Sequence, residues 1–359
     1  MNFSERLPFL KALLEASGPS GFEGRAAKVW ADEAAGFSSV TSDYHGNVYA
    51  SIKPVSGGSG LKILLTGHID EIGLIVTHID SDGFASLAPI GGWDAQVLLG
   101  QRLRVLAKDG DLIGVLGRKP AHLLEGDDKR TAVKLADMTL DLGFDADEVK
   151  RLVRVGDVAV LEGPVLEFGV LAEGKGRLVS KALDDRVGTF AVLEALRILA
   201  ASGCSHEVIA LAAVQEEIGS FGARVATFKL EPHVALVVDV TFESKQPGVP
   251  AKKVGEVPFG SGANINISPF SNPVVVRELL EVAEREGIPT TLSANGDVTS
   301  TDADATAISR VGVPTGVISI PLRYMHSASE MVALEDVRAV IDLLVAYVSG
   351  LTADRSFNR

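Results

Sequence analysis

Residues 61–70 read LKILLTGHID, an apolar run that ends in polar residues. A short apolar run bounded in this way is typical of a strand that is buried on both faces of a sheet. The same design recurs in EVIALAAVQEEIG at 207–219, HVALVVDVT at 233–241 and PTGVISIP at 314–321. These four stretches therefore predict the central strands of one sheet, each followed closely by polar side chains.

Amphipathic stretches accompany these strands. Residues 4–16 and 25–34 carry apolar side chains at helical spacing, and residues 183–201 do so ahead of the second strand. Strands that alternate with helices favour a layered α/β domain. We therefore expect a central mixed sheet flanked by helices.

The sequence changes in character between about Glu71 and Glu173. Short alternating runs separated by Gly turns replace the long apolar runs, as in QRLRVLAKDGDLIGVLG at 101–117. This pattern predicts a small β-barrel or sandwich. We interpret it as an insertion at 71–173 in a domain made of residues 1–70 and 174–359, with Trp93 as an anchor of the smaller unit.

The composition excludes several classes of function. A formal net charge of −13 and a pI of about 5.1 disfavour nucleic acid and anionic membranes as partners. The single cysteine, Cys204, permits no intrachain disulfide and no cysteine-rich zinc site, so a reducing compartment fits best. The N-terminal residues 1–18 lack the apolar core of a signal peptide, and no later run is long enough to span a bilayer. We expect a cytoplasmic protein.

His68 and Asp70 close the first predicted strand, and the two-residue period of a strand points both side chains to the same side. Asp70 could therefore orient the His68 imidazole and fix its tautomer while His68 binds a metal ion. For an isolated His-x-Asp, a polar strand end that meets solvent is the better interpretation. The motif alone is weak evidence.

Further acids and a histidine follow the other predicted elements. Glu216 and Glu217 end the second strand; one could bind metal while the other transfers protons. Asp184 and Asp185 begin a helix, where they could simply cap its N-terminus. The remaining candidates are Asp239 at the end of the third strand and His326 in the loop after the fourth.

The joint pattern favours a metal site over these separate explanations. Ligands of open α/β sheets bind beyond the carboxyl ends of the strands, so these groups can converge. Converged acids repel one another unless cations neutralise them. Histidines and carboxylates without thiols suit borderline divalent ions such as zinc or cobalt.

At these residues the chain resembles the tetrahedral (TET) aminopeptidases, the glutamyl, leucyl and lysyl aminopeptidases that have a cocatalytic pair of metal ions. The matching motifs span nearly the whole chain: LPFLKALLEASGPSGFEG, GHIDEIG, KPAHLLE, KALDDRVG, QEEIGSFGA, VVDVT and STDADATAISRVGVPTGVISIPLRYMHS. Thr301 and Asp302 stand where the family usually has a Gly-Gly-Thr-Asp run, which leaves the shape of this loop and of the substrate pocket open. DMTLDLG at 137–143 matches the family's pattern only loosely.

The resemblance implies a role for each candidate residue. Asp184 would bridge two divalent ions per subunit, His68 and Asp239 would complete one site, and Glu217 and His326 the other. Glu216 would be the general base and Asp70 the orienting acid. Family members form hollow dodecamers through the β-domain, which implies a homo-oligomer that processes short peptides.

The expected function is therefore a metal-dependent aminopeptidase, in which a metal-bridging water attacks the scissile carbonyl and Glu216 takes its proton. A related two-metal deacylase or dipeptidase is one alternative, and activity on N-acylated substrates would favour it. A glycoside hydrolase would act without metal. A non-catalytic metal-binding scaffold would bind ions without turnover.

Overall fold

The four apolar stretches form neighbouring strands of one sheet in the computed structural model, which describes residues 3–55, 60–126, 130–169 and 175–359. They are β3 (Lys62–His68), β12 (Glu207–Ala213), β13 (Val234–Phe242) and β16 (Thr315–Arg323). They run parallel in the order β12-β3-β13-β16. Their carboxyl ends therefore meet at one edge of the sheet.

Shorter strands extend this sheet on both sides, mostly in antiparallel pairs. The described strands run in the order β1-β2-β12-β3-β13-β16-β17-β11-β10. In addition, β14 pairs with β16, and β15 pairs with β14. Their bounds are β1 (Ser39–Ser42), β2 (Val48–Ile52), β10 (Leu166–Phe168), β11 (Arg177–Ser180), β14 (Ala263–Ile267), β15 (Thr290–Ala294) and β17 (Glu330–Ala333). The predicted mixed sheet is confirmed.

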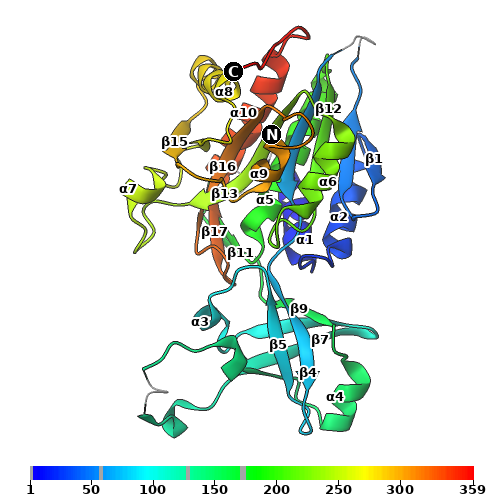
Figure 1. Ribbon diagram of the computed structural model, residues 1–359, viewed down its shortest axis with the longest axis vertical. Coiled ribbons are helices and arrows are strands. Elements are labelled where there is room, and N and C mark those ends of the chain that lie inside the picture. Colours follow the sequence, from blue (N-terminus) through cyan, green and yellow to red (C-terminus); the bar gives the residue numbers. More distant parts are fainter. Residues whose placement is uncertain (1–2, 56–59, 127–129, 170–174) are drawn as a thin grey trace.

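Helices cover both faces of the sheet (Figure 1). The main apolar core lies between one face and α1 (Phe3–Glu15), α2 (Gly24–Ala34), α5 (Leu183–Ser202), α8 (Pro273–Glu286) and α10 (Leu334–Gly350). A smaller core lies on the other face, beneath α6 (Phe221–Leu230), and α9 (Asp302–Ala307) packs beside α6. The short helix α7 (Ala251–Val254) follows β13. Among the described residues, no helix combines the length and the apolar composition needed to cross a membrane.

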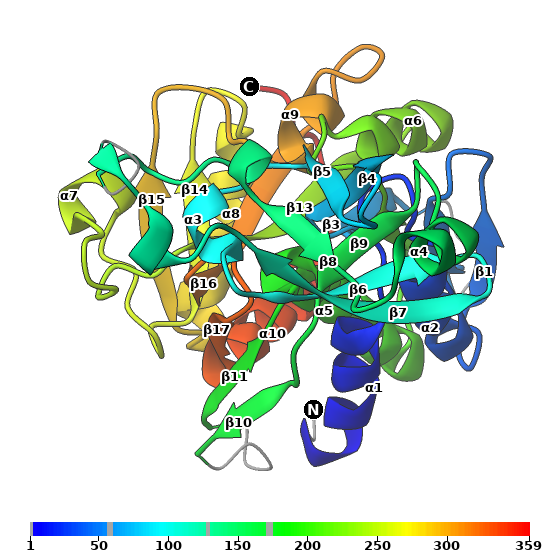
Figure 2. The same cartoon turned by 90° about the horizontal axis from the view of Figure 1, so that it is seen from below.

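A closed barrel forms the second part, with its own core and the strand order β4-β5-β8-β7-β6-β9. Its elements are β4 (Gly73–Ile79), β5 (Ala85–Ile90), α3 (Ala95–Leu98), β6 (Arg102–Ala107), β7 (Gly110–Gly117), η1 (Ala121–Leu123), η3 (Leu135–Asp137), β8 (Thr139–Asp141), α4 (Ala146–Leu152) and β9 (Val158–Leu161). Seen from below, the barrel strands lie in front of the centre of the α/β part (Figure 2). The predicted barrel-like unit is confirmed. The next strand along the chain, β10, lies outside the barrel and pairs with β11 in the large sheet.

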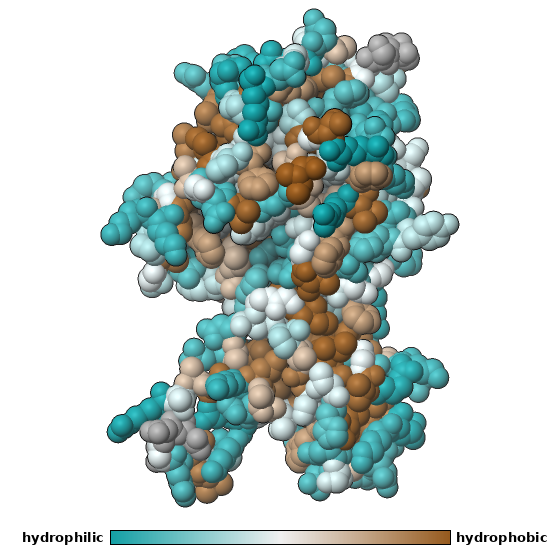
Figure 3. Space-filling model, in the orientation of Figure 1, coloured by the Kyte–Doolittle hydropathy of each residue, from teal (hydrophilic) through white to brown (hydrophobic). Residues whose placement is uncertain are grey.

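A narrow waist joins the two parts, and hydrophobic side chains gather along it (Figure 3). Only residues 69–72 separate the end of β3 from the start of β4. The carboxyl end of β3 therefore faces the barrel, and any site at that edge of the sheet lies beside the waist.

Candidate metal centre and active site

The sheet brings the predicted residues of different strands together. His68 is the last residue of β3 and pairs with Ala213, the last residue of β12, so Glu216 and Glu217 follow at the same edge. Val237 pairs with Thr66, and this register places Asp239 level with His68. Asp239 lies within β13, not at its end as the sequence pattern suggested, because β13 continues to Phe242.

Asp184 is the shared member of two ligand groups. Its Oδ1 lies 3.1 Å from Nε2 of His68, and its Oδ2 lies 3.4 Å from Nε2 of His326. Nε2 of His326 is also 3.2 Å from Oε1 of Glu217.

One group is therefore His68, Asp184 and Asp239, and the other is Asp184, Glu217 and His326; within each group the ligand atoms lie within 4.8 Å of one another. All five predicted metal ligands are thus brought together, and the two oxygens of Asp184 point to different histidines. Two imidazoles and three carboxylates without thiol fit two divalent ions that share one carboxylate.

The buried charges and shifted pKa values of the cluster favour the binding of cations. Burial, reinforced by neighbouring acids, raises the pKa of Asp239 well above its usual value and that of Glu216 to about 10. Burial lowers the pKa of His326, but the contacts with Asp184 and Glu217 outweigh it and raise that pKa to about 11. These shifts favour the neutral acids, and bound divalent ions would compete with their protons.

Asp70 supports both His68 and the pair of glutamates. Its Oδ1 lies 3.4 Å from Nδ1 of His68, slightly longer than an ordinary hydrogen bond. Asp70 also accepts hydrogen bonds from the backbone N–H groups of Glu216 (3.1 Å) and Glu217 (3.2 Å), and from the Ser20 hydroxyl (2.5 Å). The orienting residue predicted for the histidine therefore also holds the turn that presents the two glutamates.

Glu216 lies beside the first ligand group. Its Oε2 is 4.0 Å from Nε2 of His68, and 13% of its side chain is exposed. It is thus near the ions that the cluster would hold, yet it belongs to neither ligand group. This is the placement that a general base requires.

Two further acids brace the cluster: Glu330, which sequence reasoning missed, and Asp185, which it considered only together with Asp184. Glu330 accepts hydrogen bonds from the backbone N–H groups of Asp184 (3.1 Å) and His326 (2.8 Å), and is buried. Asp185 accepts from the backbone N–H groups of His68 (3.1 Å) and Gly188 (3.1 Å). Asp185 is visible in the motif KALDDRVG, but Glu330 has no distinguishing sequence signal beyond its closeness to His326.

Asp302, in the segment that departs from the family pattern, also reaches this region. It begins α9 and is 1% exposed, and within the described residues neither carboxylate oxygen has a hydrogen-bond partner of normal geometry. Burial raises its pKa to about 7. It is therefore a buried acid near the cluster that binds a proton more readily than an exposed aspartate does.

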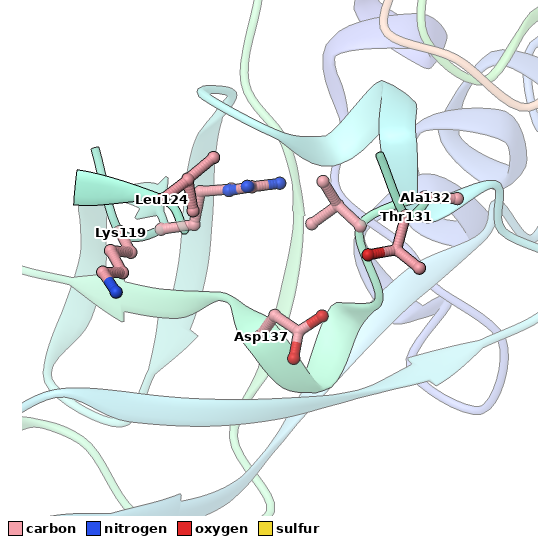
Figure 4. A pocket seen from close by; sticks show the side chains of 7 residues that line it. Lys119, Leu124, Thr131, Ala132 and Asp137 are labelled. Carbon is pink, nitrogen blue, oxygen red and sulfur yellow. The ribbon is translucent and has the colours of Figure 1, made fainter. Parts of the chain in front are cut away.

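A separate cavity of about 260 Å³ lies in the barrel part (Figure 4). The described residues that line it are Arg118, Lys119, Leu124, Thr131, Ala132, Val133 and Asp137. None of these residues belongs to the carboxylate–histidine cluster, so this cavity is not the candidate active site.

Comparison with known proteins agrees with the fold. The family model described as M42 glutamyl aminopeptidase matches residues 46–343. The chain therefore belongs to the M42 family of metal-dependent aminopeptidases and is a hydrolase. The expected family, enzyme class and general function are confirmed.

Individual relatives share most of their length with this chain. The lysyl aminopeptidase of Pyrococcus furiosus is 36% identical over 355 residues, which cover 95% of this chain and 96% of the relative. The aminopeptidase APDkam598 of the archaeon Desulfurococcus kamchatkensis has a TM-score of 0.89 at 34% identity, over 98% of this chain and 96% of its own.

A third relative is known as an assembly. The TET1 peptidase of Pyrococcus horikoshii, which can assemble into a tetrahedron or a large octahedral shell, has a TM-score of 0.82 at 30% identity, over 96% of this chain and 99% of its own. Large homo-oligomers thus occur among the structural relatives of the chain.

Proposed function

We propose that the chain removes N-terminal residues from short peptides at a centre of two divalent ions held by His68, Asp184, Glu217, Asp239 and His326. The observation that carries this proposal is the position of Asp184, whose two oxygens each face a different histidine. A carboxylate with one oxygen for each of two ligand groups is suited to bridge two ions. Zinc and cobalt suit the mixed nitrogen and oxygen donors best.

The protein's own residues supply the proton transfers and the orientation. When bound, the divalent ions would polarise the scissile carbonyl and lower the pKa of the attacking water. Glu216 takes a proton from that water and passes it to the leaving amine, a role that its position next to the ligand groups supports. Asp70 holds His68 and the Glu216–Glu217 turn in place.

Four wider features belong to the same proposal. The insertion 71–173 serves oligomerisation and substrate access, and the protein forms a homo-oligomer, with a hollow dodecamer as the expected assembly. The site of action is the cytoplasm, in keeping with the single cysteine of the chain. Short peptides are the substrates because the site combines an acid-rich cluster, able to attract a free α-ammonium group, with a metal centre suited to amide hydrolysis.

The test compares an unblocked peptide mixture with its N-acetylated copy, using metal-free protein to which zinc or cobalt is restored, with a chelator control. We expect free amino acids to be released only from the unblocked peptides and only with metal. Release from the acetylated set alone would replace the proposal with a deacylase. Metal binding without release from either set would indicate a scaffold.

A further inference from the structure

A turn of the barrel part, Gly91–Gly92–Trp93, reaches across the waist to the metal centre. The carbonyl oxygen of Gly92 lies 2.7 Å from Nδ1 of His326, which stands in the loop between β16 and β17. His326 belongs to the α/β part, whereas the turn lies between β5 and α3. The sequence pattern assigned Trp93 only an anchoring role, so this contact has no place in the function described so far.

This contact selects the tautomer of His326. A carbonyl oxygen can only accept a hydrogen bond, so Nδ1 of His326 must be the donor. In the neutral imidazole, Nε2 then carries the lone pair, and it is Nε2 that faces Asp184 and Glu217. Hydrogen bonds of this kind hold metal-binding histidines in their tautomer and ring orientation.

The Nδ1 atoms of the two histidines thus face different parts of the molecule. Nδ1 of His68 faces Asp70, an acid of the α/β part, at 3.4 Å. His326 depends on a backbone carbonyl of the barrel part. A change in the position of the barrel turn should therefore affect the second ligand group and leave the first intact.

The turn fits closely against both parts. Gly91 has φ +79°, and a Cβ atom there would lie 2.6 Å from Cγ2 of Ile72 and 3.4 Å from Cβ of Glu217. The indole N–H of Trp93 donates to the carbonyl of Gly73 at 2.8 Å. Trp93 and Ala328, from the His326 loop, both pack against the barrel core. The carbonyl of Gly92 is therefore fixed from both sides of the waist.

We propose that the Gly91–Trp93 turn is a positioning element that makes retention of the second metal ion depend on the seating of the barrel. This inference rests on the proposed two-ion function. The proposal gives the insertion a role within its own subunit. The backbone of its Gly91–Trp93 turn completes the support of the group formed by Asp184, Glu217 and His326.

Two glycine variants of the full-length protein separate this role from ordinary backbone strain. Gly91→Ala introduces a side chain at positive φ and a clash with Ile72. Gly100→Ala, also in the barrel, has nearly the same φ of +78° but nothing within 4 Å of its Cβ. Both variants carry the cost of positive φ, and only the first moves the turn.

The measurement is calorimetric titration of the metal-free proteins with zinc. We expect two ions per chain for the wild type and for Gly100→Ala, and in Gly91→Ala one ion of wild-type affinity and one weakened by roughly 10- to 100-fold. Equal weakening of both ions, or wild-type binding of both, in Gly91→Ala would overturn the proposal. A wild type that binds no zinc would instead contradict the proposed function itself.

A milder variant guards against misfolding of Gly91→Ala. Trp93→Phe keeps an aromatic ring but removes the hydrogen bond to Gly73, and thermal unfolding of the metal-free protein reports its fold. We expect selective weakening of the same ion, to a smaller extent than in Gly91→Ala. If folded Trp93→Phe and Gly91→Ala both bind the second ion normally, the turn is only structural.

Discussion

Asp184 and Asp185 are adjacent, yet their carboxylates perform different tasks. Asp184 faces both histidines, whereas Asp185 accepts the N–H of Gly188, three residues further along α5, and the N–H of His68. Helix capping and metal binding were alternative interpretations of this pair. The structure separates the two roles: Asp185 accepts a backbone hydrogen bond within the first turns of α5 and braces His68, while Asp184 lies in the ligand cluster.

The residue-scale prediction concerns Glu216→Gln. The amide keeps the shape of the side chain but cannot accept a proton from water, so we expect metal binding to persist and kcat to fall by about 10²- to 10⁴-fold. Metal content and peptide hydrolysis are measured on the same samples. His68→Ala and Asp184→Ala are the contrasting variants, since both remove a ligand and should lose metal as well as activity. Normal turnover by Glu216→Gln would exclude it as the base.

The site residues differ in how far sequence could predict them. His68, Asp239 and Glu217 follow from the sheet, because parallel strands bring their carboxyl ends to one edge. Glu330 and the carbonyl of Gly92 could not be predicted in this way. Glu330 acts through backbone N–H groups, and a backbone carbonyl is present at every residue, so neither contact leaves a pattern in the side chains.

At the scale of elements, the close approach of β3 to α5 depends on Gly67. A Cβ atom at this position would lie 2.8 Å from Oδ2 of Asp185, 2.8 Å from the backbone nitrogen of Thr189 and 2.9 Å from the carbonyl carbon of Gly188. Two of these atoms are helix backbone and cannot rotate away. The strand β3 therefore requires glycine at position 67, immediately before His68.

We accordingly expect Gly67→Ala to lower the free energy of unfolding by about 1–3 kcal/mol, the usual cost of overpacking. Gly117→Ala, at the end of β7, is the matched control because nothing lies within 4 Å of its added Cβ. Urea unfolding of the metal-free variants measures the difference. Equal midpoints for the two variants would show that β3 and α5 can separate without cost.

The elements that the sequence predicted are those with long, regular patterns. The helix predicted at 183–201 is α5 at 183–202, and the strand within 61–70 is β3 at 62–68. Short strands such as β14 (ANINI) and β15 (TTLSA) were not predicted, because they have few residues and mix polar with apolar side chains. They become strands by pairing at the edge of a sheet whose centre is already defined.

At the scale of the whole molecule, a buried ion network ties the barrel to the α/β part. Glu71, at the waist, accepts hydrogen bonds from Lys181 (2.6 Å), Arg186 (2.9 Å) and the backbone N–H of Gly18 (3.0 Å). Burial alone would raise the pKa of Glu71, but the two cations keep it below its usual value. This network holds the waist, next to Asp70, against the α/β part.

Buried acids should make the stability of the whole metal-free protein depend on pH. Burial raises the pKa of Asp302 to about 7, of Glu330 to about 8 and of Glu216 to about 10, whereas unfolded acids titrate near pH 4. Between about pH 5 and pH 10 the native state therefore binds more protons than the unfolded state. Its stability then falls as pH rises, by about 1.4 kcal/mol per pH unit for each proton of difference.

Divalent ions should reverse this trend, because they take the place of the protons and bind more tightly as pH rises. We expect the difference in Tm between zinc-loaded and chelator-treated protein to widen from pH 5.5 to pH 8.5. Asp302→Asn, whose oxygens lack a normal hydrogen-bond partner among the described residues, should make the metal-free Tm fall less steeply up to about pH 7. Asp297→Asn, an exposed acid ahead of the same helix, is the control and should not change that slope. A Tm difference that stays constant with pH would mean that the cluster does not exchange protons for metal ions.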